Sequence, residues 1–120
     1  MFIFNFQLNG TITLGENIAD TGGLLAAFSA YQKLLKRIGT EPKLPGLPYS
    51  ERQMFWIAFA SVWCRKQTNH HLEYTIENSV HAPAKFRVNG ALSNIKEFSE
   101  DFKCEKGSKL NPDSKCSLWQ

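Results

Sequence analysis

The sequence lacks a long hydrophobic run. Its longest apolar stretch, Met54 to Trp63, is interrupted only by Ser61, and it is well short of the roughly 18 residues needed to cross a bilayer. We therefore expect no membrane-spanning helix and no membrane contact by this segment. Residues 1–7 also lack a basic region and a small-residue cleavage site, so we expect no signal peptide there.

The sequence has no block of basic residues interleaved with aromatic ones. Its formal net charge is only +3, and Lys and Glu are intermixed along the expected helices, so we expect no nucleic-acid partner. Internal repeats and low-complexity segments are absent as well. With 120 residues, 42% of them hydrophobic, the chain amounts to one domain that can form a packed core.

Cysteine is scarce and odd in number, with three residues at Cys64, Cys104 and Cys116. Their spacing leaves two interpretations open. Cys104 and Cys116 could close a turn-rich loop and leave Cys64 unpaired, or all three could be buried thiols of a cytosolic protein.

The clearest pattern in the sequence is the helical spacing of its apolar residues. Apolar residues recur at helical spacing over residues 14–38, from Ser50 to about Lys66, over 69–78 and over 92–102, which predicts a mainly α fold. Ser50 and Gln53 fit a capping box, and Gly39 is expected to end the first helix. We attribute Gly22-Gly23 inside that helix to close approach of another backbone.

Between the helices, turn-forming residues predict irregular structure. Residues 40–49 are a proline-rich connector, and Ala82-Pro83 interrupts the chain. We expect residues 86–88 to be extended, Asn89-Gly90 to turn, and the tail from Cys104 to be a loop.

Two carboxylates stand out at Glu16 and Asp20. On a helix they lie on one face, roughly 6 Å apart along the axis, where like charges repel. A helix N-terminus, an arginine or a metal ion would compensate. A purely structural interpretation of Glu16 is equally open, because Thr13 and Glu16 match the N-cap and N3 positions of a capping box.

These residues also carry a resemblance. Asn9-Gly10 and the run from Thr13 to Gly23 resemble the neprilysin and endothelin-converting-enzyme family of zinc metallopeptidases. The similarity continues in order through Leu44-Pro45-Gly46-Leu47, Gln53 to Trp56, Val62-Trp63-Cys64, His81 to Gly90, Asn111-Pro112, Lys115-Cys116 and Trp119. It implies that residues 9–120 are the C-terminal helical portion of a thermolysin-like (gluzincin) peptidase domain.

The resemblance implies a role for each of four residues. Glu16 would be the third ligand of one zinc ion, and Asp20 would orient a ligating histidine. His81 would stabilise the oxyanion, and Arg87 would hold the substrate carbonyl. Taken without the resemblance, His81 would be a loop imidazole that caps a carbonyl, and Arg87 would be a surface charge.

The family's His-Glu-x-x-His helix, which provides two zinc ligands and the general base, is missing. His70 and His71 are adjacent, point about 100 degrees apart on a helix and are interpreted as surface residues. We therefore expect this chain alone to be inactive. The alternatives are a non-catalytic binding module that docks through Met54 to Trp63, and a pseudogene product that does not fold.

The resemblance also implies the surroundings of the chain. It implies an extracellular or plasma-membrane ectodomain, a peptide substrate for the full-length parent, and an upstream domain of the same protein as partner. There the three cysteines would pair with cysteines earlier in the chain.

Residues 1–8 lie outside the resemblance. We interpret them as an N-terminal extension and hypothesise that they are intron sequence read as coding sequence; a genuine strand from Phe2 to Leu8 is the alternative. Asn9-Gly10-Thr11 predicts a turn and is also an N-glycosylation sequon, which matters only in a secreted protein.

Overall fold

The computed structural model describes residues 2–3 and 6–118. Its elements are β1 (Phe2–Ile3), β2 (Phe6–Gln7), α1 (Leu14–Ile38), α2 (Glu51–Val62), α3 (Asn69–Asn78), α4 (Ala84–Asn94) and α5 (Lys96–Asp101). The predicted mainly helical fold is confirmed. Among the described residues, no helix is both long and apolar enough to cross a membrane.

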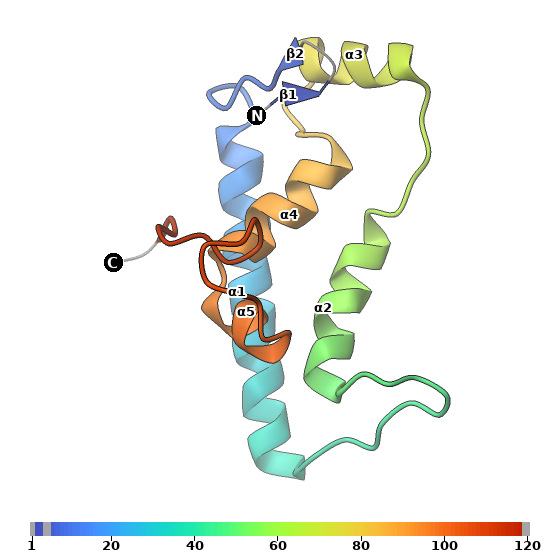
Figure 1. Cartoon of the computed structure of the whole chain (residues 1–120), viewed down its shortest axis with the longest axis vertical. Coiled ribbons are helices and arrows are strands. Elements are labelled where there is room, and N and C mark those ends of the chain that lie inside the picture. The colour runs from blue at the N-terminus through green and yellow to red at the C-terminus, as the bar shows by residue number, and fades with distance from the viewer. Residues whose placement is uncertain (1, 4–5, 119–120) are drawn as a thin grey trace.

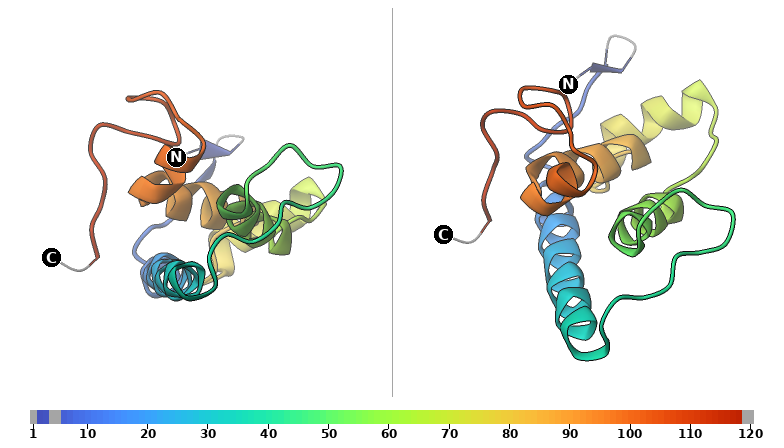
Figure 2. Two further views of the ribbon diagram at one scale, coloured as in Figure 1. Left: turned by 90° about the horizontal axis from the view of Figure 1, so that it is seen from below. Right: turned by 60° about the horizontal axis from the view of Figure 1, so that its bottom comes forward.

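The long helix α1 runs along the molecule, α4 packs against it, and α5 packs against α4 (Figure 1). Helix α2 lies on the other side of α5, and α3 crosses the end of the molecule near the antiparallel pair β1–β2 (Figure 1). Figure 2 shows that the connector between α1 and α2 swings away from the helices. The predicted irregular connector over residues 40–49 is therefore confirmed.

The core lies where α1, α2, α4 and α5 meet. Phe28 of α1 and Trp56 of α2 are 2% and 1% exposed, and their ring centroids are 4.2 Å apart. Leu24, Ala91, Leu92, Ile95 and Phe98 complete the buried cluster. Burying aromatic side chains of this size is the largest hydrophobic contribution available to so short a chain.

Helix α2 is fixed to α5 by polar contacts as well. Ser50 and Gln53 form the predicted capping box, with Ser50 Oγ accepting from Gln53 N–H and Ser50 N–H donating to Gln53 Oε1. Asp101 accepts from Arg52 Nε and from Trp56 Nε1, each at 2.7 Å. We call Arg52, Trp56 and Asp101 the α2–α5 clamp.

Several local expectations are wrong, and packing explains the largest. Residues 86–88 are not extended and Asn89-Gly90 does not turn, because both lie inside α4. Phe86, Ala91 and Leu92 of this helix are buried, so burial of that face overrides the turn propensity of Asn-Gly. The expected helix over 92–102 is broken at Ile95, which is extended and 1% exposed.

Helix ends also differ from expectation. Thr13 precedes α1 but forms no capping hydrogen bond, so the predicted Thr13–Glu16 capping box is wrong. The Thr13 hydroxyl donates instead to Asn9 O and accepts from Asn17 Nδ2. Gly39 ends α1 at φ 83° as expected.

Two further expectations fail. Helix α2 ends at Val62 rather than near Lys66. A Cβ added at Gly23 would meet no heavy atom within 4 Å, so the expected close approach of another backbone is wrong at Gly23, whereas for Gly22 it stays a prediction.

The cysteines form no disulfide within residues 2–3 and 6–118. The Cys104–Cys116 bond is therefore not formed. The alternative of three buried thiols is also wrong, because Cys64 and Cys116 are exposed and Cys104 is partly exposed.

Candidate functional site

Helix α1 presents the two predicted carboxylates on consecutive turns of one face. Glu16 lies in the first turn, where a negative charge is favoured by the helix dipole, and its side chain is 36% exposed. Asp20 lies one turn further along and is only 10% exposed. The two side chains therefore differ sharply in their access to solvent.

His81 and Arg87 come from the start of α4. Pro83 occupies the N-cap position of this helix, so His81 lies in the segment before it and Arg87 in its first turns. The side chains of His81 and Arg87 are 54% and 11% exposed. The structure thus brings together all four residues predicted from the sequence, and we call Glu16, Asp20, His81 and Arg87 the carboxylate–arginine site.

The Asp20–Arg87 pair is bidentate. Arg87 Nε donates to Asp20 Oδ2 and Arg87 Nη2 donates to Asp20 Oδ1, each at 2.5 Å. This hydrogen bonding raises the pKa of Arg87; attraction to Asp20 and Glu16 acts in the same direction, and burial opposes it. Arg87, with a side chain 11% exposed, is therefore a partly buried cation and not a surface charge, and it compensates the repulsion between the two carboxylates.

Glu16 joins the site through its Oε2 atom. This oxygen lies 2.8 Å from His81 Nδ1 and 3.4 Å from Arg87 Nη2. The same His81 nitrogen also lies 3.4 Å from Arg87 Nη1, and whether it donates or accepts depends on the tautomer of the imidazole. His81 thus lies beside a carboxylate and a guanidinium, whereas the alternative interpretation has it capping a carbonyl.

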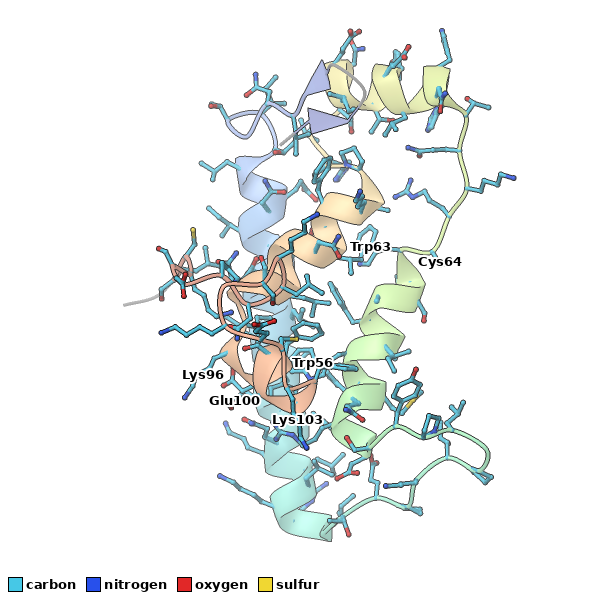
Figure 3. All side chains as sticks on the ribbon, viewed as in Figure 1. Trp56, Trp63, Cys64, Lys96, Glu100 and Lys103 are labelled. Carbon is cyan, nitrogen blue, oxygen red and sulfur yellow. The ribbon has the colours of Figure 1, made fainter. Side chains whose placement is uncertain are left out.

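Trp63 was missed as a site residue by the sequence reasoning. It lies at the C-terminal end of α2, whereas Trp56 lies between α2 and α5 (Figure 3). The Arg87 guanidinium carbon sits 4.1 Å from the centroid of a Trp63 ring, a cation–π arrangement. Trp63 Nε1 is buried without a hydrogen-bond partner in the described part of the chain. No local signal marks this role, because Trp63 is 24 positions from Arg87.

A groove of about 1040 Å³ adjoins the site. Asp20 and Arg87 are part of its lining, together with apolar residues that include Leu14, Ile18 and Leu118. The Asp20–Arg87 pair therefore lines the groove, and through Arg87 it also contacts Glu16 and His81. His70 and His71 lie on α3 and are exposed.

The described residues do not complete a metal site by themselves. No group of three His, Cys, Asp or Glu side chains in this part of the chain is placed to hold an ion. A catalytic zinc needs three protein ligands. Glu16 Oε1 has no hydrogen-bond partner among the described residues, so Glu16 can offer one carboxylate oxygen.

Comparison with known proteins identifies the class of protein to which this helical fold belongs. The model of Peptidase family M13 matches residues 3–118, and the chain belongs to that family. It is 50% identical over 115 residues to an endothelin-converting enzyme homolog of Locusta migratoria, covering 96% of this chain and 16% of that protein. It is 48% identical over 113 residues to human neprilysin, covering 94% of this chain and 15% of that protein.

Solved structures share the fold of this chain. One is described as a Haemonchus galactose-containing glycoprotein complex; it superposes with a TM-score of 0.88 at 40% identity, over 93% of this chain and 20% of that one. Another is the Mycobacterium tuberculosis zinc metalloprotease ZMP1 with an inhibitor, at a TM-score of 0.85 and 28% identity, over 95% of this chain and 17% of that one. The chain thus spans about one sixth of the length of the curated relatives that it matches.

Proposed function

We propose that this chain contributes part of the catalytic centre of a zinc metalloendopeptidase that hydrolyses peptide bonds in short peptides. The observation that carries the proposal is the convergence of Glu16, Asp20, His81 and Arg87, although Glu16 and Arg87 are 71 positions apart. Family membership supports the same conclusion. The remaining catalytic groups would come from an upstream domain of the same protein.

Arg87 is proposed to hold the substrate carbonyl. Its Nε and one edge of Nη2 are taken by Asp20, which fixes the plane of the guanidinium. Arginine has five N–H donors, so the Nη1 end remains to donate to a carbonyl oxygen. Because the ring of Trp63 lies under the guanidinium, the cation is oriented before substrate arrives, which lowers the entropy lost on binding.

His81 is proposed to stabilise the oxyanion that forms when water attacks that carbonyl. Its Nδ1 lies 2.8 Å from Glu16 Oε2, which leaves Nε2 as the ring atom that can face the substrate. In the imidazolium form Nε2–H donates to the developing negative charge. The 54% exposure of the side chain keeps it open to a bound peptide.

Glu16 is proposed as one zinc ligand through Oε1, and Asp20 as the carboxylate that orients a ligating histidine. Each carboxylate oxygen has two lone pairs, so Asp20 can accept a further hydrogen bond while it holds Arg87. The other zinc ligands would lie outside this chain. On this proposal the chain alone has no peptidase activity, because one carboxylate cannot fix a catalytic metal.

The proposed location is extracellular or on a plasma-membrane ectodomain. The similarity to a structure described as a glycoprotein complex supports passage through a compartment where proteins are glycosylated. The expected disulfides to cysteines elsewhere in a longer protein fit this location, because Cys64 and Cys116 are exposed thiols.

A chimera tests the proposal. Residues 9–118 would replace the matching segment of human neprilysin, and peptide hydrolysis and bound zinc would be measured together. We expect an active, zinc-containing chimera in which E16Q loses zinc and H81A lowers kcat by about 100-fold or more. H70A, at an exposed histidine of α3, is the matched control for H81A and should leave both readouts unchanged. Full zinc occupancy in E16Q would contradict the ligand role.

A second candidate is a non-catalytic binding module. It is favoured by the exposed apolar surface near the end of α2, where Val62 is 78% exposed. This module would associate with a longer relative through Met54 to Trp63. Light scattering of the purified chain, alone and mixed with a longer relative, separates the candidates. A monodisperse monomer that binds no family member argues against association.

A further inference from the structure

The segment that joins β2 to α1 carries Asn9-Gly10-Thr11, a sequence of the Asn-x-Thr type. Asn9, Gly10 and Thr11 are all exposed. In Figure 1 this segment forms a loop at the N-terminal end of α1, on the side away from α3. The sequon therefore lies on the surface of the folded chain, where an enzyme can reach it.

The oxygen and the nitrogen of the Asn9 carboxamide differ in their hydrogen bonding. Oδ1 accepts from the backbone N–H groups of Thr11, at 3.0 Å, and Ile12, at 3.4 Å. The backbone oxygen of Asn9 accepts from the hydroxyl of Thr13 at 3.2 Å. By contrast, neither Asn9 Nδ2 nor the Thr11 hydroxyl has a hydrogen-bond partner within residues 2–3 and 6–118.

We propose that Asn9 is an N-glycosylation site. The proposal rests on the extracellular location proposed above, and it does not depend on peptidase activity. The donor is a lipid-pyrophosphate-linked oligosaccharide. Asn9 Nδ2 attacks the anomeric carbon of its first sugar, a C–N bond forms, and the bond from that carbon to the pyrophosphate oxygen breaks. The lipid pyrophosphate leaves, and one amide proton passes to a base of the transferase; nothing is oxidised or reduced.

The turn accommodates the product. Both hydrogen bonds that shape it use Oδ1, and the modified nitrogen keeps one hydrogen, so glycosylation removes none of these bonds. Thr13, which anchors the turn and is 1% exposed, bonds to the backbone of Asn9 rather than to its side chain. The sugar therefore attaches on the outward side of a turn that is already formed.

Translation of the whole chain into endoplasmic-reticulum microsomes tests the site. The 120 residues would follow a cleavable leader, and an added sequon after Gln120 would report entry into the lumen. We expect two glycans on the wild-type chain, each removed by peptide N-glycosidase. T11S should keep both, whereas T11A and N9D should carry only the reporter glycan.

The choice of variants separates the sequon from the turn. N9D keeps an acceptor oxygen for the Thr11 and Ile12 amides but has no amide nitrogen, and T11A keeps both backbone donors. A wild-type chain that carries only the reporter glycan would overturn the proposal, as would a second glycan that persists in N9D. Because the readout is a mass shift, it remains decisive if the chimera described above proves inactive.

Discussion

Trp56 lies in the middle of helix α2 and Trp63 directly follows its last residue, and each tryptophan accompanies an Asp–Arg pair. In the α2–α5 clamp, Trp56 Nε1 and Arg52 Nε both donate to the side chain of Asp101. In the carboxylate–arginine site, Trp63 stacks on Arg87 but donates no hydrogen bond within the described part of the chain. The same residue types thus form a contact with satisfied donors at Trp56 and one with an unpaired donor at Trp63.

The difference lies in which bonding positions remain. Asp101 is held by two side-chain donors, and Trp56 is 1% exposed, so this region has little left to offer a ligand. At the site, Arg87 Nη1 makes only a 3.4 Å contact with His81 among the described residues, and the His81 side chain is 54% exposed. Structural clamps satisfy their polar groups internally, whereas binding sites retain groups that a ligand satisfies.

The largest effect is expected from breaking the clamp. D101A removes the acceptor of both Arg52 and Trp56, whose donors would be left without it, so we expect a loss of about 3 kcal/mol in the free energy of unfolding. Urea denaturation followed by circular dichroism measures it. The control is E100Q, which breaks the exposed Lys96–Glu100 pair and should cost about 0.5 kcal/mol or less. Equal effects of the two variants would refute the clamp.

Breaking the site is expected to affect activity more than stability. R87K keeps the charge but cannot make the bidentate contact with Asp20. Loss of a charge-assisted hydrogen bond of about 1.5–3 kcal/mol corresponds to a fall of about 10- to 100-fold in kcat/KM of the chimera with neprilysin. Steady-state kinetics give the value, and K85R, at an exposed position of α4, is the matched control. Unchanged kinetics in R87K would remove Arg87 from the proposed function.

Paired tryptophan substitutions sharpen the comparison directly. W56F removes the donor to Asp101 and should cost about 1–2 kcal/mol of stability. W63F removes a nitrogen that has no partner in the described residues and weakens only the stacking on Arg87. We therefore expect a loss of about 0.5 kcal/mol in the free energy of unfolding. Denaturation curves of the two variants compare these costs. If W63F costs as much as W56F, Trp63 Nε1 has a partner in solution.

The smallest effect concerns Tyr31, beside the clamp. Burial, followed by the hydrogen bond to Glu41, raises the pKa of Tyr31 above its ordinary value. The unfolded chain then loses this proton first as pH rises, so the resulting stability is present below about pH 10 and declines above it. Alkaline absorbance titration should show a late tyrosinate transition that Y31F abolishes. A late transition that survives in Y31F would contradict the assignment.

Periodicity and local motifs predicted part of the fold well. The bounds of α1 and α3 and the Ser50–Gln53 capping box follow from local sequence, and the structure confirms them. Residues 86–90 were predicted wrongly because the local preference of Asn-Gly for a turn is weaker than the burial of Phe86, Ala91 and Leu92. Tertiary packing of this kind cannot be read from a short window.

At the site too, the sequence indicates which residues take part but not which of them contact one another. The resemblance indicated Glu16, Asp20, His81 and Arg87, and the structure brings them together. The partners within that set were not predictable, because Asp20 and Arg87 are 67 positions apart. The stacking of Trp63 depends on where α2 ends, and the sequence placed that end four residues too late.

Helix α1 connects the two regions mechanically. It is anchored in the core at Phe28 and carries Glu16 twelve residues, or about 18 Å, further along a stiff rod. A tilt of roughly 5° about the anchor would displace Glu16 by about 1.6 Å over that length, and misplacement by 1 Å can cost about 100-fold in rate. Small repacking around Phe28 would therefore tilt α1 and displace Glu16, although Phe28 does not contact this carboxylate. The expected result is a large loss of catalytic rate.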